Sequence, residues 1–476
     1  MSVGNVDVGA ALAKVEAMLR RDRSISPAAR GMFELLVLII NLMMAKLGVN
    51  SSNSGIAPSK DPGRPRGAKP RTQGTPRKPG GQKGHRGTTL EWTPEPDRVE
   101  PLSIDRRTIP PGQYSNAGYD ARQVVDIVIA KSVVEYRAEI LENAKGDRFV
   151  AQFPAAVTQR VQYGPGVKSQ SVYHSQQQLT PYDRIREYFQ DQCGLPVSAG
   201  SVFNFNLEAF DRLEPFESFL IEKLISQPVL HADETGIQID KKLHWLHCLC
   251  NDRWTMFFPH TDRGAEADKA MGVLPLFKGK LGHDHWKAYF RFGCDHFLCN
   301  AHHLRQLEYA SAEDHQRWAV KMKSLLLEIH RAVKDAGGAL GSATAARFRR
   351  RYRGILTRAD RECPARPPKP GTQRRVAQTK SRNLLERLRD FETETLRFMT
   401  DPLVPFTNNP CENDLRMTKV QQKISGCFRS FQGAQIFCRV RGFISTCRKH
   451  GIAATVALQA LFEGKLSEII KQLEAT

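Results

Sequence analysis

The spacing of apolar residues changes from a helical to a strand period at Pro228. Three apolar runs follow it closely, at residues 229–239, 243–250 and 254–258. Runs of this length with short polar breaks predict a three-stranded antiparallel meander. After it the pattern predicts a helix over about residues 264–277, a strand that ends near Asp284, and a strand-to-helix passage at residues 295–307.

Three meander strands, a helix and then strand–helix units form the order typical of an α/β fold of the RNase H-like type. In that fold the first and fourth strands are neighbours, so we expect Asp233 and Asp284 to lie side by side. The segment between Asp284 and Glu412 is far longer than a minimal fold of this type requires. Residues 310–400 are largely helical and charged, with a Pro/Arg-rich interruption at residues 364–371, and we predict a helical insertion there.

Helical spacing dominates on both sides of the predicted sheet. Residues 7–48 predict a helix whose apolar positions fit a short coiled-coil seam for oligomerisation, or equally a helix packed on the protein's own core. The seam positions are Phe33, Leu36, Ile40, Met43 and Leu47. Residues 164–226 predict a helix that ends near Gly194, a turn and a second helix. Both helix-turn-helix units and ordinary helical hairpins share that pattern. Residues 433–476 predict two helices separated at Gly451.

Between the first helix and the rest lie two segments of different character. Residues 51–90 are rich in Gly, Pro, Lys and Arg, which predicts a disordered basic linker that contacts phosphates or serves as a solvated tether. Its candidate DNA contacts are Arg77, Lys78, Lys83 and Arg86. Residues 91–158 predict a small strand-rich module in which residues 123–130 and 133–140 pair. The module has no cysteine, so a thiolate zinc site is excluded there.

The overall charge favours a polyanionic partner. The chain carries 70 Lys and Arg against 50 Asp and Glu, a formal net charge of +20. Nucleic acid fits this balance, with membranes and acidic proteins as alternatives. The ten scattered cysteines, in a chain without a secretory leader, indicate reduced intracellular thiols. The longest apolar run, residues 33–47, is too short and too polar to span a bilayer, so we expect a soluble protein.

Three acids stand in marked settings: Asp233 at the end of an apolar run, Asp284 between two histidines, and Glu412 after Pro410. Three carboxylates brought together can hold two hard divalent cations, and two metals suit in-line attack on a phosphodiester. Each acid also has an ordinary structural alternative. Asp233 can begin a turn, Asp284 can be a loop acid, and Glu412 can close a capping box with Asn409. Glu234 should point to the other face of its strand.

Cations and thiols near these acids suggest further contacts. Arg416 and Lys419 lie four and seven residues after Glu412, on the same helical face, and fit either DNA phosphates or a salt-bridged surface helix. Cys299 and His302 have the spacing of metal ligands but no evident second pair. Another pair of thiols, Cys248 and Cys250, shares one strand face and fits core packing better than metal binding.

Six motifs in this order resemble the transposases of the insertion-sequence-66 family, which look like DDE enzymes. They are NSSNS at residues 50–54, KPGGQKGH at 78–85, HADETG at 231–236, HHLRQL at 302–307, TNNPCE at 407–412 and KISG at 423–426. The resemblance covers nearly the whole chain. It implies a catalytic, metal-binding triad of Asp233, Asp284 and Glu412, with two magnesium ions as cofactor and manganese as an alternative. It also adds Lys423 to the candidate DNA contacts.

The family implies cleavage and strand transfer at transposon ends, with double-stranded end and target DNA as substrates. A homo-oligomer on DNA, accessory proteins of the element, and a cytoplasmic place at a bacterial nucleoid are further implications. Relatives carry a cysteine-rich zinc module after the linker, whereas residues 91–158 lack its cysteines, so we expect no zinc there. The alternatives are a hydrolysis-only RNase H-like nuclease and a catalytically silent DNA-binding protein. We expect domains at residues 1–50, 51–90, 91–158, 159–226, 227–432 and 433–476.

Overall fold

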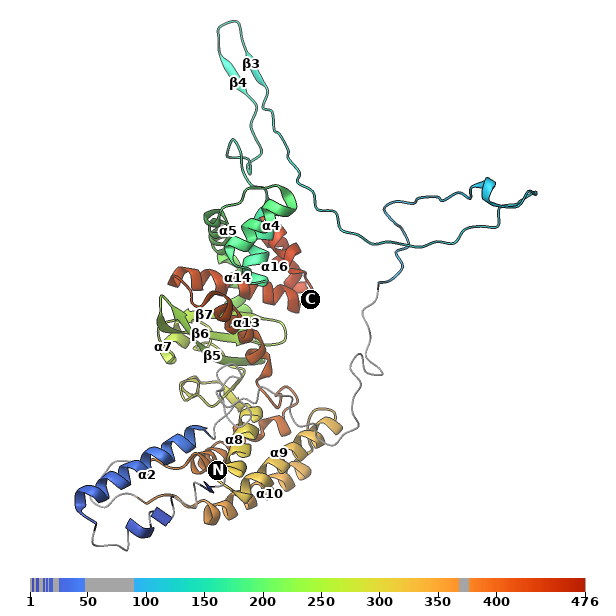
Figure 1. The fold of residues 1–476 in the computed structure, drawn as a ribbon. Helices are drawn as coiled ribbons and strands as arrows, with labels where there is room; N and C mark the ends of the chain where they lie inside the picture. The colour runs from blue at the N-terminus through green and yellow to red at the C-terminus, as the bar shows by residue number, and fades with distance from the viewer. Residues whose placement is uncertain are drawn as a thin grey trace.

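The computed structural model describes residues 25–47, 90–367 and 376–475, with a few short stretches before residue 20 (Figure 1). The predicted basic linker therefore lies outside the described residues, except for its last position. The same holds for four candidate DNA contacts, Arg77, Lys78, Lys83 and Arg86. The first elements are a small hairpin, β1 (Ser2–Val3) and β2 (Val6–Asp7), and the helix α2 (Pro27–Leu47). The prediction of a helix over residues 7–48 is thus wrong at Asp7, which lies in β2, and correct for α2.

A five-stranded mixed sheet lies at the centre of the fold. Its strands are β5 (Val229–Ile239), β6 (Lys242–Cys250), β7 (Thr255–His260), β8 (Lys280–His283) and β9 (Asp295–Leu298). Their order is β7-β6-β5-β8-β9, with β6 antiparallel to both neighbours and β8 and β9 parallel to β5. The predicted meander and the predicted contact of first and fourth strands are confirmed. The helix after β7 is shorter than predicted: α7 (Ala265–Ala270) ends before Gly272, whose φ of +78° turns the chain.

Helices that precede the sheet in sequence and helices at the C-terminal end of the chain share one hydrophobic core with it. They are α3 (Pro165–Val172), α4 (Tyr182–Cys193), α5 (Ala199–Arg212), α6 (Glu214–Ile225), α14 (Phe431–Lys449), α15 (Ala454–Phe462) and α16 (Leu466–Ala475). Phe216 of α6 meets Phe443 of α14 edge to face, with ring centroids 5.0 Å apart. The predicted helix end at Gly194 is confirmed, since that residue adopts the left-handed conformation. The sequence predicts a single helix after Gly451, but the structure has two, α15 and α16, because the chain turns at Gly464, with φ +78°.

Helix α14 lies along β7, the edge strand of the sheet (Figure 1). Its Thr446 hydroxyl accepts a hydrogen bond from the backbone N–H of Thr255, at 3.2 Å. A Cβ added at Gly442 would lie 3.1 Å from the Thr255 carbonyl oxygen, so glycine permits this close approach. The backbone of the edge strand is therefore covered by a helix.

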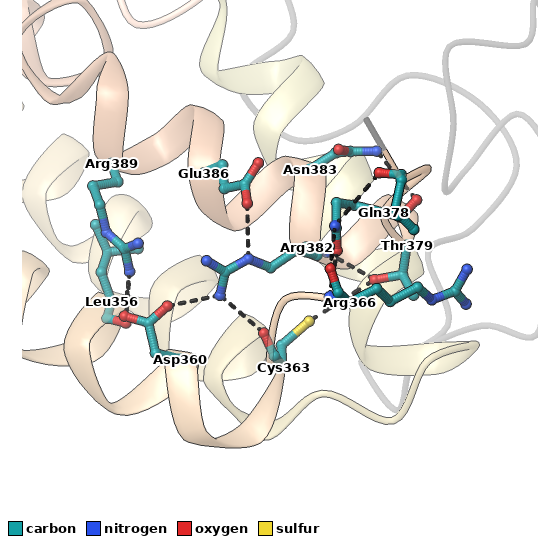
Figure 2. A network of polar contacts seen from close by, with 11 residues as sticks. Leu356, Asp360, Cys363, Arg366, Gln378, Thr379, Arg382, Asn383, Glu386 and Arg389 are labelled. Carbon is teal, nitrogen blue, oxygen red and sulfur yellow. Dashed lines mark hydrogen bonds and ion pairs between the residues drawn. The ribbon is translucent and has the colours of Figure 1, made fainter. Parts of the chain in front are cut away.

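The predicted insertion between β9 and the later helices has a hydrophobic core of its own, centred on Trp318, Met322, Tyr352 and Leu385. Its helices are α8 (Asn300–Ala312), α9 (Arg317–Asp335), α10 (Ser342–Glu362), α11 (Lys380–Asp390) and α12 (Glu392–Leu396). Figure 2 shows a polar network that joins α10 to α11. Arg382 donates to the Asp360 carboxylate at 2.7 Å and to the Cys363 carbonyl at 3.0 Å. These bonds hold the two helices together on either side of the Pro/Arg-rich interruption.

The predicted pairing of residues 123–130 with 133–140 is wrong. The described residues 90–160 contain only a short hairpin, β3 (Ile140–Glu142) with β4 (Arg148–Val150), and a 3-10 turn, Arg106–Thr108. In Figure 1 this segment extends away from the sheet and its helices. Val124 and Val128 are 93% and 91% exposed, so their apolar side chains have no surface to pack against. Strand-like spacing alone does not form a sheet without a second layer.

Candidate active site

Asp233 lies on the central strand β5, on the face that carries Cys248 of β6 opposite it. Leu230 and Ala232 are fully buried on the other face, so the strand is fixed by core packing. The Asp233 carboxylate accepts a hydrogen bond from the backbone N–H of Glu234, at 2.9 Å. The strand thus presents one carboxylate to each face at consecutive positions.

Asp284 is the first residue after β8. The register pairs His231 of β5 with Gly282 of β8, and Asp233 and Asp284 each lie two residues further on. A Cβ at Gly282 would lie 2.2 Å from the Phe297 ring, so glycine lets β9 pack closely just before Asp284. The Asp284 carboxylate accepts from the Trp286 backbone N–H at 3.0 Å, which shapes the loop after the strand.

Glu412 lies in the first turn of α13 (Asn409–Ser425). The predicted capping box is absent: Asn408, not Asn409, precedes the helix, and its side chain does not cap the helix N-terminus. Glu412 Oε1 lies 3.6 Å from His302 Nδ1 and 3.6 Å from Arg305 Nη2, both on α8. This oxygen atom is buried and has no hydrogen-bond partner among the described residues, although the side chain as a whole is partly exposed. The acid therefore faces the end of β9 and the start of the insertion.

Electrostatics relate the three acids to one another. Burial raises the pKa of the Asp233 carboxyl well above its usual range, and the charges of Glu234, Asp284 and Glu412 raise that pKa further. The structure therefore brings all three sequence-predicted acids into one neighbourhood. Within residues 90–367 and 376–475, their oxygens do not form a group closer than 4.8 Å to one another. The three carboxylates are thus close enough to interact by charge but do not form a tight cluster.

Three side chains that meet at Glu412 carry unsatisfied polar atoms. Glu412 Oε1, His302 Nδ1 and Arg305 Nε are buried without a hydrogen bond among the described residues. Buried polar groups in folded proteins are normally paired, and exceptions often mark a site for a ligand. A cation would be a partner for Glu412 Oε1 and His302 Nδ1, and a phosphate oxygen would be a partner for Arg305 Nε–H.

The donor chemistry separates three sets of residues. The carboxylates of Asp233, Asp284 and Glu412 are hard oxygen donors, which suit magnesium or manganese. Glu412 also lies within 4.8 Å of Cys299 and His302. The sequence offered no further ligand for Cys299 and His302, and the structure adds Glu412 as a third donor. Such a mixed set suits zinc better than magnesium. A third set, Cys248, Cys250 and Cys411, is buried and suits only thiophilic ions.

Glu234 takes the opposite face of β5, as its place in the strand predicted. Its carboxylate accepts from Arg263 Nε at 2.7 Å and from the Tyr289 hydroxyl at 2.6 Å. Arg263 in turn stacks on Trp245 and on Trp286, with 4.8 Å and 4.0 Å to the ring centroids. This acid is satisfied by protein partners and supports the loop that carries Asp284.

The candidate DNA contacts on α13 differ from one another. Arg416 and Lys423 are exposed, whereas Lys419 donates to the Gly236 carbonyl of β5 at 2.7 Å. Lys419 therefore has a structural contact in addition to any contact with phosphate. Sequence reasoning missed Arg305 and Asn408. Arg305 was detectable, because it lies one helical turn after His302 and so faces the same way.

None of the described helices combines the length and apolar character that crossing a bilayer demands. The family model "Transposase IS66 family" matches residues 160–436. This range covers the sheet, the insertion and α13, with all three acids. A curated protein from Sinorhizobium fredii (strain NBRC 101917 / NGR234), named "Uncharacterized protein y4jO", is 28% identical over 166 residues. The match covers 34% of this chain and 46% of that protein, so the chain spans less than half of its length. Because the family model matches more than half of its residues, the chain belongs to the IS66 family of transposases.

Proposed function

We propose that the protein is a DDE transposase that cleaves and joins DNA at the ends of an insertion sequence, in a metal-dependent reaction. The observation that supports the proposal is the electrostatic influence of Asp284 and Glu412 on Asp233, although these acids lie 51 and 128 residues apart in sequence. They come from a central strand, the end of its parallel neighbour and the first turn of a helix. Family membership supports the transposase role.

The sheet supports an RNase H-like fold. The strand order is third, second, first, fourth and fifth, with only the second strand antiparallel to the rest. This is the arrangement in which the first and fourth strands place their carboxylates together. The insertion then follows β9 and returns the chain at Asn408, next to β5.

The residues divide the work as follows. Asp233, Asp284 and Glu412 would hold magnesium, which activates an attacking hydroxyl and stabilises the leaving oxygen when bound. Burial and the neighbouring acids raise the pKa of Asp233, and a bound cation would favour its ionised form. Arg305, whose Nη2 lies 3.6 Å from Glu412 Oε1, would contact a DNA phosphate beside Glu412. The exposed Arg416 and Lys423 extend the basic surface along α13.

The test uses the full-length protein with labelled DNA that carries the terminal sequences of its own element, with magnesium or with EDTA. We expect end cleavage followed by joining to target DNA, both dependent on the metal. Glu412→Gln and Asp284→Asn should abolish both products, whereas Asp211→Asn, an exposed acid on α5, should not.

Two other outcomes correspond to the alternative functions. Cleavage without any joined product indicates a hydrolytic nuclease of the same fold. Binding of end DNA without cleavage, unchanged by Glu412→Gln and by EDTA, indicates a silent DNA-binding protein and contradicts the proposal.

A further inference from the structure

Asn408 differs from its neighbour Asn409 in a way that the sequence does not reveal. Asn408 is completely buried, whereas Asn409 is exposed. Asn408 precedes α13 at the position where a side chain usually caps the helix. Its side chain instead points away from the helix and bonds to the central strand. The buried side-chain amide bonds to a strand residue 176 positions earlier, so its role is not helix capping.

The side-chain bonds fix Asn408 against β5. Nδ2 donates to the Ala232 carbonyl at 2.9 Å, and Oδ1 lies 2.7 Å from Nδ1 of the buried His231. Because Nδ2 is the donor to Ala232, Oδ1 is left to accept, and His231 donates through Nδ1–H. Ala232 directly precedes Asp233, so this amide holds the strand at the acid itself.

The backbone bonds of Asn408 reach the other two acids. Its carbonyl accepts from the Glu412 N–H at 3.4 Å, which begins the turn that carries Glu412. Its N–H donates to Cys299 Sγ at 3.1 Å. The Cys299 N–H donates to the His283 carbonyl at 3.0 Å, and His283 directly precedes Asp284. Asn408 is thus linked by one or two hydrogen bonds to a neighbour of every acid.

We propose that Asn408 is a positioning residue that sets the separation of Asp233, Asp284 and Glu412, acting through Ala232, Cys299 and the first turn of α13. This inference rests on the proposed function of the three acids. Asparagine suits the position because one short side chain must donate to a carbonyl and accept from an imidazole at once. Alanine would remove both bonds and leave the Ala232 carbonyl and the His231 N–H without partners.

The test measures Mn²⁺ binding to the purified full-length protein by electron paramagnetic resonance, without DNA. Asn408→Ala should weaken Mn²⁺ binding by about 10- to 100-fold, the scale for residues that orient metal ligands. Asn409→Ala is the matched control and should bind as the unaltered protein does. In the cleavage assay, Asn408→Ala should need correspondingly more Mn²⁺ for half-maximal rate.

A purely structural role gives a different result: a lower melting temperature with an unchanged Mn²⁺ midpoint, which would overturn the proposal. If Asn408→Ala fails to fold, Asn408→Ser is measured in its place. Serine keeps a polar atom but is too short to make both bonds, so the same weakening is expected. Failure of the unaltered protein to bind Mn²⁺ would instead contradict the proposed function of the acids, so the two failures are distinguishable.

Discussion

Asp233 and Glu234 are consecutive acids on one strand, yet their surroundings differ completely. Glu234 has Arg263 and Tyr289 within hydrogen-bonding distance, and both lower the pKa that burial raises. Among the described residues, Asp233 has one hydrogen-bond donor, the Glu234 backbone N–H, and the charges that most affect its pKa, those of Glu234, Asp284 and Glu412, are negative. The comparison shows how a structural acid differs from an acid that is suited to bind a ligand. The charge of Glu234 is balanced by protein side chains, whereas the charge of Asp233 needs a bound cation or a proton to balance it.

The strand itself produces this difference. Alternate residues of β5 face opposite layers. Glu234 meets Arg263, which precedes α7, and Tyr289, which follows β8, whereas the face of Asp233 lies toward α13. A one-residue shift of the register would exchange the two environments. The fully buried Leu230, Ala232 and Ile237 oppose such a shift, because they would change faces as well.

The largest expected effect separates the two acids by activity. Asp233→Asn should lower the rate of end cleavage on the order of 10⁴-fold, the scale for a member of a catalytic set. Glu234→Gln should retain cleavage within about tenfold at a temperature where it is folded, because Glu234 acts through Arg263. Single-turnover cleavage with saturating magnesium measures both. An equal loss of cleavage rate in the two variants would contradict the distinction between a catalytic and a structural acid.

The second effect concerns stability, and here Glu234 is the more important of the two acids. Glu234→Gln should reduce the free energy of unfolding by about 2–3 kcal/mol, less than for a fully buried ion pair because Arg263 is partly exposed. Glu266→Gln, an exposed acid on α7, is the control and should change it by less than about 0.5 kcal/mol. Urea unfolding followed by circular dichroism provides the measurement.

The smallest effect is the pH dependence of stability without metal. The pKa of Asp233 is raised on folding, so the folded state holds its proton at a pH where the unfolded chain has lost it. Stability therefore falls as pH rises from the unfolded pKa to the folded pKa. Asp233→Asn removes this loss and should raise the melting temperature at pH 7.5 but not at pH 3.5. A variant that melts lower than the unaltered protein at pH 7.5 would show that the carboxylate is already neutralised.

Much of the sheet followed from the sequence, because β5, β6 and β7 are apolar runs separated by short polar breaks. The same reasoning failed for residues 123–140, where the spacing is equally strand-like. The difference is the second layer: β5 is covered on both faces, whereas the apolar side chains of residues 123–140 are exposed and no described element packs against them. Local spacing reports which face of a segment is apolar, not whether another element covers that face.

The acids could be chosen from the sequence, but their supporting residues could not. Asn408 looks like a helix cap and Glu412 like part of a capping box, since both interpretations use only residues within one turn. The contacts that decide their roles join Asn408 to residues more than 100 positions earlier. Such contacts depend on the path of the insertion, which no local pattern encodes.

Helix α14 has a consequence for the evolution of the chain's end. The strand β7 would otherwise expose a row of backbone donors and acceptors to any other chain in the cell. The region that matches the family model ends at residue 436, in the first turns of α14. A copy of the gene truncated there would still encode the three acids. Its product would lose both the cover over β7 and the core side chains of α14, α15 and α16, so such a truncation would act through misfolding and association while leaving the three acids in the sequence.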